Sequence, residues 1–334
     1  MKLSKIAEFL NISIDEDVMN TDISGVSSLD MAKTGDLSFL EESRHLEKAE
    51  LSKATAVLLK EKHPSIRCIQ LIHPEPKWAF SKVANKILES HRPYKGISDK
   101  AVISKSAKIG KNTTIHPLAV IEDHVSIGDD CHIYPHTYIA EGVSIGNSTI
   151  IKANVTIENK TSIGSNCMIH GGTTIGGDGF GFTPGRDGLE KFPQIGGVII
   201  EDDVEIGACC TIDCGAMNDT IIKRGTKLDS NVHVAHNATI GENTMLCGSS
   251  SVAGSAKVGN NCIIGGASAV KDHIELSDGV ILGGFTAAIG SIKKPGIYVG
   301  FPAVDHVSWK MQLASLRMVP SLRDKVLDIE KKLK

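Results

Sequence analysis

From Ala101 the chain reads AVISKS AKIGKN TTIHPL AVIEDH VSIGDD, and this pattern of six residues continues to Asp178. The third residue of each of these thirteen sextets is isoleucine, from Ile103 to Ile175. The pattern breaks at 179–197, "GFGFTPGRDGLEKFPQIGG", and resumes at Val198. It shifts phase at "AMND", residues 216–219, and then keeps an aliphatic residue at every sixth place. Those residues are Ile222, Leu228, Val234, Ile240, Leu246, Val252, Val258, Ile264, Val270, Leu276 and Leu282.

A strict period of six excludes an α-helix, because 3.6 residues per turn would spread the aliphatic positions around its whole surface. A hairpin sheet would instead alternate with period two. The period fits a triangular β-solenoid, in which six residues make one short strand and one corner. Three strands then complete a coil of about 18 residues, and the aliphatic side chains stack inward on those of neighbouring coils. Glycine, asparagine and aspartate supply corners that need positive φ.

The segments outside the repeat predict two further parts. Residues 1–97 alternate helical and extended patterns, including an amphipathic helix at "WAFSKVANKILESH", and predict a small α/β domain. "RPYKGISDK", residues 92–100, is expected to link that domain to a solenoid domain over 98–303.

The tail, residues 304–334, predicts two helices, 304–318 and 321–334, broken at Pro320. It carries seven Lys and Arg against four Asp and Glu, whereas the whole chain has a net charge of −3. Charge alone leaves two alternatives: a solvated helix pair that packs against sister chains, or a docking surface for an acidic partner.

Composition narrows the class of protein. The net charge of −3 over 334 residues disfavours a nucleic-acid-binding surface. No apolar run is long enough to span a membrane, and the N-terminus shows no signal peptide, so we expect a cytoplasmic protein. The eight cysteines form no CxxC pair, and we expect reduced thiols that act as small apolar residues, with no metal site.

One stretch of the repeat, "VHVAHNATIG" at 232–241, carries residues suited to chemistry. A spacing of 18 stacks Gly254 on His236, and His273 follows one coil further along the same edge. An imidazole accepts a proton near neutral pH, and a glycine lets a backbone N–H approach an oxyanion. The set is suited to acyl transfer, although histidine and glycine are also ordinary corner residues of such a prism.

The chain resembles the UDP-3-O-(3-hydroxyacyl)glucosamine N-acyltransferases of lipid A biosynthesis. The resemblance covers nearly the whole chain. It rests on "ISGVSSLDMAKTGDLSFL", the interrupting segment with "TIDCGAMNDTII", "AHNATIGENT", "VAGSAKVGNNCIIGGASAVKDHIEL" and "KKPGIYVGFPA". It implies a mainly β fold: a left-handed parallel β-helix with the α/β domain before it and a helical tail after it. It also implies a homotrimer with its sites in the clefts between prisms.

The resemblance implies a role for each residue of the candidate site. His236 would be the general base for the 2-amino group of glucosamine, and the Gly254 N–H would hold the thioester oxyanion. His273 would bind the sugar nucleotide or polarise the site. Asp229 and Asn237 would orient His236 and contact the substrate.

Other implied contacts lie in the first domain and on the donor. Phe39 would stack on the uracil of the UDP-sugar, with His45 beside it where the family often has tyrosine. Glu41 and Glu42 stand where the family usually reads "NPK", and Cys214 replaces an arginine usual in "TIDRGA". The acyl donor would be acyl carrier protein, an acidic partner, with the chain carried on its phosphopantetheine and no other cofactor.

The segment Gly279–Ile292, "GVILGGFTAAIGSI", would line the groove for the acyl tail. Its small residues Gly283, Gly284 and Ala287 leave room for a long chain.

Three alternatives stay open at this point. One is the related UDP-N-acetylglucosamine O-acyltransferase, which lacks the first domain. Another is a zinc prism of the carbonic-anhydrase type with His233, His236 and His273 as ligands. Strand alternation argues against it, because His233 and His236 are expected to point to opposite faces. The third is a purely structural prism that binds a partner, in which His236 would be dispensable.

Overall fold

The computed structural model describes residues 1–89, 94–300 and 306–333. Residues 92, 93 and 301–305 therefore fall outside it, and with them the start of the expected linker, the end of "KKPGIYVGFPA" and the start of the tail. The described chain divides into two compact units, Met1–Tyr94 and Lys95–Lys334. No described helix has the length and apolar character needed to cross a membrane.

The first unit is the expected small α/β domain. Its four strands pair in parallel in the order β1-β2-β3-β4. In α1, buried Leu3, Ile6, Ala7 and Leu10 form one helical stripe, and the helix ends at Asn11, whose φ of 53° is left-handed. The elements are α1 (Leu3–Leu10), η1 (Glu16–Val18), β1 (Gly25–Val26), β2 (Asp36–Phe39), η2 (Ser43–His45), α2 (Leu46–Leu51), β3 (Ala56–Leu59), β4 (Ile69–Ile72) and α3 (Pro76–Glu89).

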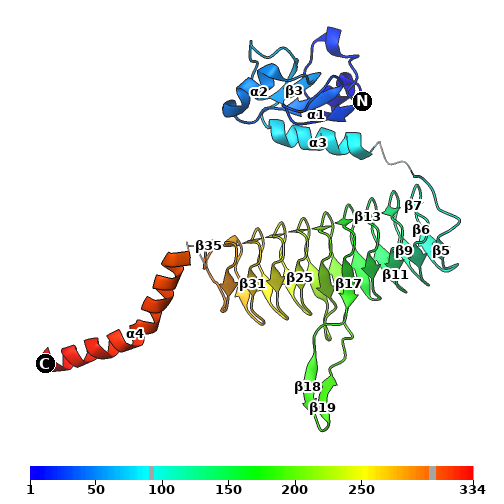
Figure 1. The fold of residues 1–334 in the computed structure, drawn as a ribbon. Helices are drawn as coiled ribbons and strands as arrows, with labels where there is room; N and C mark the ends of the chain where they lie inside the picture. Colours follow the sequence, from blue (N-terminus) through cyan, green and yellow to red (C-terminus); the bar gives the residue numbers. More distant parts are fainter. Residues whose placement is uncertain (90–93, 301–305, 334) are drawn as a thin grey trace. The chain divides into compact units, whose positions relative to one another are not determined.

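The second unit contains the solenoid, a left-handed parallel β-helix with three flat faces (Figure 1). Face 1 consists of β7 (Thr114–Ile115), β10 (His132–Ile133), β13 (Ile150–Ile151), β16 (Met168–Ile169), β21 (Glu205–Ile206), β24 (Lys227–Leu228), β27 (Met245–Leu246), β30 (Ile263–Ile264), β33 (Val280–Leu282) and β35 (Gly296–Tyr298). Face 2 consists of β5 (Val102–Ile103), β8 (Val120–Ile121), β11 (Tyr138–Ile139), β14 (Thr156–Ile157), β17 (Thr174–Gly177), β22 (Thr211–Asp213), β25 (His233–Val234), β28 (Ser251–Val252), β31 (Ala269–Val270) and β34 (Ala287–Ala288). Face 3 consists of β6 (Lys108–Ile109), β9 (Ser126–Ile127), β12 (Ser144–Ile145), β15 (Thr161–Ile163), β20 (Val198–Ile200), β23 (Thr220–Ile222), β26 (Thr239–Ile240), β29 (Lys257–Val258) and β32 (Glu275–Leu276).

The register follows the sequence period. Ile139 pairs with Ile157 and Ile157 with Ile175, each 18 residues apart, and all three are buried. Burying a side chain of this size stabilises the fold by about 1.5–3 kcal/mol, so the isoleucine columns form the core of the prism. Most residues at the sixth position of the sextets adopt left-handed φ, as at Asn112 and Asn154.

Two segments depart from the prism. The interruption at 179–197 forms an arm built on an antiparallel hairpin, β18 (Phe182–Gly185) and β19 (Gly188–Lys191), which projects from the prism (Figure 1). The tail forms one helix, α4 (His306–Leu333), with Pro320 inside it, so the predicted break into two helices is wrong. Proline removes one helical hydrogen bond and crowds the preceding turn, which bends an exposed helix without ending it. Figure 1 shows this change of direction along α4.

All eight cysteines are free thiols. Cys131, Cys167, Cys210 and Cys262 are buried in the prism core, where burial raises the pKa of each thiol, that of Cys167 to about 11. Cys214, which stands in place of the family's arginine, is also buried, and burial raises its pKa. The expectation of small apolar thiols is confirmed for these five.

Candidate acyl-transfer site

His236 lies at the corner that follows β25 and precedes β26. Hydrogen bonds between coils fix what lies beside it: Ser255 N–H donates to His236 O (2.9 Å), and His273 N–H donates to Gly254 O (3.1 Å). His236, Gly254 and His273 therefore follow one another along this corner on successive coils, as the spacing of 18 predicts. His273 is exposed and has a left-handed φ of 57°.

The side chain of Asn237 sets the tautomer of His236. Asn237 Nδ2 donates to Asn218 O (2.8 Å), which fixes the orientation of the amide. Its Oδ1 then accepts from Ala216 N–H (3.0 Å) and faces His236 Nδ1 at 3.1 Å. Because an amide oxygen only accepts, Nδ1 carries the proton, and the neutral imidazole keeps its lone pair on Nε2. A base on this corner acts through Nε2.

Gly254 lies directly against that nitrogen. A Cβ atom built on Gly254 would stand 2.7 Å from both Nε2 and Cε1 of His236, so only glycine fits beside the imidazole. Within the part of the chain that is described, the Gly254 N–H donates to no acceptor. At another corner, the N–H group at the same position of the sextet is hydrogen-bonded: Asp129 N–H donates to Asn147 Oδ1 (2.8 Å). A free N–H therefore lies on the coil next to the imidazole.

Asp213, at the end of β22, belongs to this site although the sequence reasoning missed it. Its carboxylate lies 3.8 Å from His233 Nε2 and its side chain is 15% exposed. Burial raises the pKa of Asp213, and the charges of His233 and His236 oppose that effect. The expectation that the two histidines point to opposite faces is wrong, because both side chains are half-exposed and neither enters the core. Strand alternation does not apply, since His233 is in β25 whereas His236 is in the corner.

Both interruptions of the repeat converge on this corner. The returning end of the arm bonds to the "AMND" segment through Ile195 N–H to Ala216 O (2.8 Å). That segment in turn holds Asn237 through Ala216 and Asn218. On the outgoing end, a Cβ on Gly179 would stand 2.6 Å from His236 Cβ. The two interruptions of the repeat, at 179–197 and 216–219, are therefore the sequence feature that indicates this corner.

Asp229 lies at a different corner and does not orient His236. Its carboxylate accepts from Ser230 N–H (2.7 Å) and Gly248 N–H (3.0 Å). It follows β24 of face 1, whereas His236 follows β25 of face 2. Of Asp229 and Asn237, only Asn237 makes the contact that orients His236.

The expected groove residues lie toward the C-terminal end of the prism. Ala287 is exposed in β34 and pairs with Ala269, which pairs with Ser251, which pairs with His233. Small side chains therefore follow His233 along face 2. Gly283 and Gly284 lie in the turn that joins β33 to β34, and a Cβ on Gly283 would stand 2.8 Å from Val299 Cγ1.

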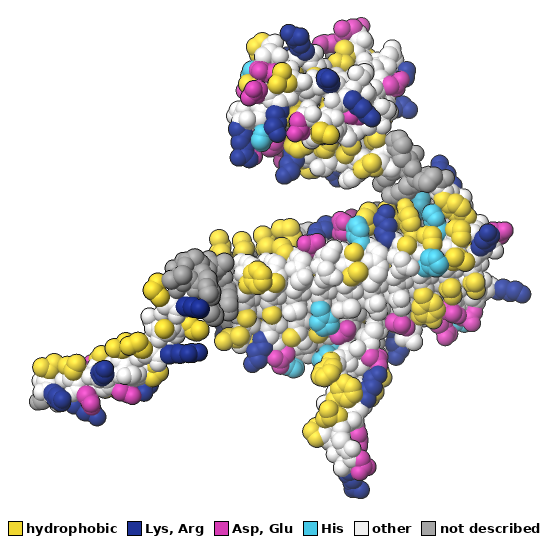
Figure 2. Space-filling model, in the orientation of Figure 1, with side chains coloured by type: hydrophobic (Ala, Val, Ile, Leu, Met, Phe, Trp, Pro, Cys, Tyr) yellow, Lys and Arg dark blue, Asp and Glu magenta, His cyan; other side chains and the backbone are white. Residues whose placement is uncertain are grey.

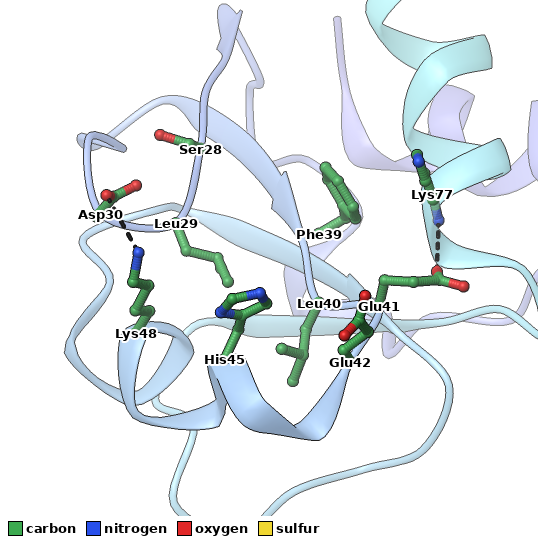
Figure 3. Close-up of a pocket in the computed structure, with 10 residues that line it drawn as sticks. All are labelled: Ser28, Leu29, Asp30, Phe39, Leu40, Glu41, Glu42, His45, Lys48 and Lys77. Carbon is green, nitrogen blue, oxygen red and sulfur yellow. Dashed lines mark hydrogen bonds and ion pairs between the residues drawn. The ribbon is translucent and has the colours of Figure 1, made fainter. Parts of the chain in front are cut away.

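The first unit has its own pocket, lined by the two residues expected there (Figure 3). Phe39 at the end of β2 packs on Phe80 with ring centroids 4.8 Å apart, and His45 faces the same hollow from η2. Carboxylates and amines surround it. The other lining residues are Ser28, Leu29, Asp30, Leu40, Glu41, Glu42, Lys48 and Lys77.

Glu41, one of the departures from the family pattern, is engaged within the first unit. Its carboxylate accepts from Lys77 N–H (3.2 Å) and lies 3.6 Å from Lys60 Nζ. Glu42 pairs with Arg44 at 2.7 Å. Among the described residues, no three His, Cys, Asp or Glu side chains gather to hold a metal ion.

Comparison with known proteins supports the sequence reasoning. Residues 20–86 match the family model for UDP-3-O-(3-hydroxymyristoyl) glucosamine N-acyltransferase, LpxD, and residues 106–141 and 142–177 match bacterial transferase hexapeptide repeats. A UDP-3-O-acylglucosamine N-acyltransferase of Syntrophotalea carbinolica is 52% identical over 92% of this chain and 90% of its own length. One of Francisella tularensis subsp. holarctica is 51% identical over 98% of this chain and 99% of its own length.

Solved structures share the fold of the prism. An Arabidopsis UDP-N-acetylglucosamine acyltransferase superposes with a TM-score of 0.56 at 23% identity, covering 61% of this chain and 71% of its own. A second UDP-N-acetylglucosamine acyltransferase gives a TM-score of 0.50 at 24% identity, with the same coverage.

Proposed function

Because this chain belongs to the family of UDP-3-O-acylglucosamine N-acyltransferases, enzymes of lipid A biosynthesis, we propose that it carries out their reaction through His236 and Gly254. The substrates are 3-hydroxyacyl acyl carrier protein and UDP-3-O-(3-hydroxyacyl)-glucosamine. The product carries a second acyl chain on the 2-amino group of the sugar.

In the proposed mechanism the amine nitrogen attacks the thioester carbonyl carbon, and a C–N bond forms. His236 Nε2 accepts a proton from that nitrogen, and the Gly254 N–H donates to the oxyanion of the tetrahedral intermediate. Collapse breaks the C–S bond, and the imidazolium returns its proton to the phosphopantetheine sulfur. The observation that carries this proposal is the position of Nε2, the ring nitrogen not engaged by Asn237, beside the Gly254 backbone.

The test is a mass-spectrometric assay with both substrates, using wild type and His236→Ala. We expect a second acyl group on the sugar nitrogen with wild type, and a rate lower by about 10²-fold or more in the variant. His170→Ala, which removes an imidazole that pairs with Glu205 on face 1, is the matched control and should retain the wild-type rate. An undiminished rate in His236→Ala removes His236 as the base, and no product with wild type overturns the reaction itself.

We also propose that the pocket of the first unit binds the uracil ring, with Phe39 stacking on it and His45 at its edge. An aromatic wall and nearby hydrogen-bonding groups are suited to a flat, polar base. Phe39→Leu keeps an apolar side chain against Phe80 but removes the stacking face. UDP binding measured by calorimetry should weaken in this variant and stay unchanged in Phe9→Leu, which lies outside the pocket. Equal affinities would contradict the assignment.

We propose that acyl carrier protein docks on the basic residues of α4 together with Lys293 and Lys294. Over its described side chains, residues 310–333, α4 exposes Lys and Arg beside apolar residues (Figure 2). An acidic protein binds such a surface faster and with stronger salt dependence. Lys331→Glu with Lys332→Glu should raise KM for the acylated carrier protein and leave the rate with a small acyl-pantetheine thioester unchanged. An equal effect on both donors would contradict this role.

We further propose a homotrimer, with each site completed at a cleft between prisms. The arm supports this assembly, because Phe180 and Leu189 are 84% and 73% exposed and Figure 2 shows apolar side chains gathered on the arm. Sedimentation equilibrium tests it: a mass three times that of the chain is expected, and a monomer that retains full activity would overturn it.

A further inference from the structure

The arm brings one more side chain to His236. Gly179 lies where the arm leaves the prism, and Gln194 lies where it returns. The position that a Cβ on Gly179 would occupy is 2.8 Å from Gln194 Oε1 and 3.0 Å from His236 Cδ2. The amide oxygen of Gln194 and the edge of the imidazole therefore both border the space that a Gly179 side chain would fill.

The amide of Gln194 is held in one orientation. Its Nε2 donates to Phe192 O (3.1 Å), and the same nitrogen lies 2.7 Å from where a Cβ on Gly181 would stand. Oε1 is therefore directed to the other side, toward Gly179. That oxygen is buried and has no hydrogen-bond partner among the described residues. Buried acceptors are almost always paired, so an unpaired one at this place calls for a functional explanation.

We propose that Gln194 is a positioning residue for the acyl transfer, whose side-chain oxygen stabilises the imidazolium that His236 becomes when it takes the proton of the amine. The proposal rests on the function proposed above. A carbonyl oxygen carries partial negative charge, which attracts an imidazolium and not a neutral imidazole, and this attraction acts across the space beside Gly179 without direct contact. An oxygen that is fixed, dry and unpaired favours the charged form without having to reorganise.

Other charged and titratable groups surround the same imidazole. Asp213 and His233 lie on the neighbouring strands β22 and β25. Asp178 precedes Gly179 at the base of the arm and is paired with Lys191. Asp272 and His273 follow on the coil beyond Gly254. The test therefore leaves all of these in place and changes only Gln194.

The test compares the pH dependence of kcat/KM in wild type, Gln194→Leu and Gln194→Glu. Loss of the oxygen should move the midpoint of the acidic limb to lower pH, by about 0.5 unit, because a nearby partial negative charge favours the protonated imidazole. A carboxylate at the same place should move it to higher pH. Phe182→Leu, which alters the arm but keeps Gln194, should leave the midpoint at its wild-type value.

A second measurement does not depend on turnover. The pH dependence of the carbethoxylation of His236 by diethyl pyrocarbonate, followed by peptide mass spectrometry, reports the unprotonated imidazole directly. It should shift in the same directions in the two variants. Unmoved midpoints in both measurements would overturn the role of Gln194. If His236→Ala retains full activity, it is the proposed base that fails, so the two failures are distinguishable.

Discussion

The Nε2 atom of His236 and the backbone of Gly254 are in direct contact, one coil apart, with 2.7 Å between that nitrogen and the site of a Gly254 Cβ. The φ of Gly254 is not left-handed, so this glycine is required for space and not for conformation. The contact puts the proposed proton acceptor and the free N–H on adjacent coils of the prism. Neither group needs a loop movement to reach the other.

Gly254→Ala should therefore lower activity while the fold is retained. The added methyl group would displace the imidazole, and a misplacement of about 1 Å costs on the order of 10²-fold in rate. Gly266→Ala is the matched control: it has the same position in its sextet, and its Cβ would meet only Gly248 O at 3.4 Å. Steady-state kinetics and circular dichroism of both variants check this. Comparable activity in the two would contradict the importance of the contact.

Asn237→Gly tests the tautomer argument. Asn237 has a left-handed φ of 59°, which glycine adopts without strain, so the change removes the amide and leaves the corner intact. Without Oδ1 the proton is free to occupy either ring nitrogen, and we expect kcat to fall by about 10-fold or more. Asn231→Gly, with the same φ of 59° at the corner before β25, is the control. If both variants keep the wild-type kcat, Asn237 does not set the tautomer.

The sequence period was sufficient to predict the prism, because a repeat of six leaves one register in which the isoleucines stack. It also predicted that Gly254 lies on His236, since only the spacing of 18 was needed. It did not predict that Asp213 belongs to the site. The four extra residues at 216–219 lengthen the coil, and counting by 18 across them fails.

The misassigned residues have equally local causes. Asp229 is close to His236 in sequence, but one sextet separates their corners and therefore their faces. Pro320 suggested a break in the tail because local propensity gave no means to tell a bend from an end. Gln194 carries no signal of its own in the sequence, because its importance depends on how the arm returns to the prism.

The burial of Asp213 predicts a pH-dependent stability. Its folded pKa is raised above 3.8, so the folded state binds more protons than the unfolded state between 3.8 and the raised value. The wild type should lose stability as pH rises through that window, and Asp213→Asn should not. We expect the stability of Asp213→Asn relative to wild type to increase as pH rises through this window, in urea unfolding at a series of pH values. Asp130→Asn, an exposed carboxylate, is the control, and a constant difference across pH would contradict this account.

Ala287 should limit the length of the acyl chain. It lies three coils beyond His233 on the same column of face 2, about 14 Å along the prism at the usual strand spacing. An acyl tail that leaves His236 along the small residues Ser251 and Ala269 reaches this position. Ala287→Trp should therefore shift the preference toward shorter 3-hydroxyacyl donors, measured as the ratio of kcat/KM across a series of chain lengths.

Ser126→Leu, an exposed change on face 3, should leave this ratio of kcat/KM values unchanged. Because Ala287 is exposed, its replacement costs little stability, so an unaltered ratio in a folded Ala287→Trp variant would place the acyl tail on another path.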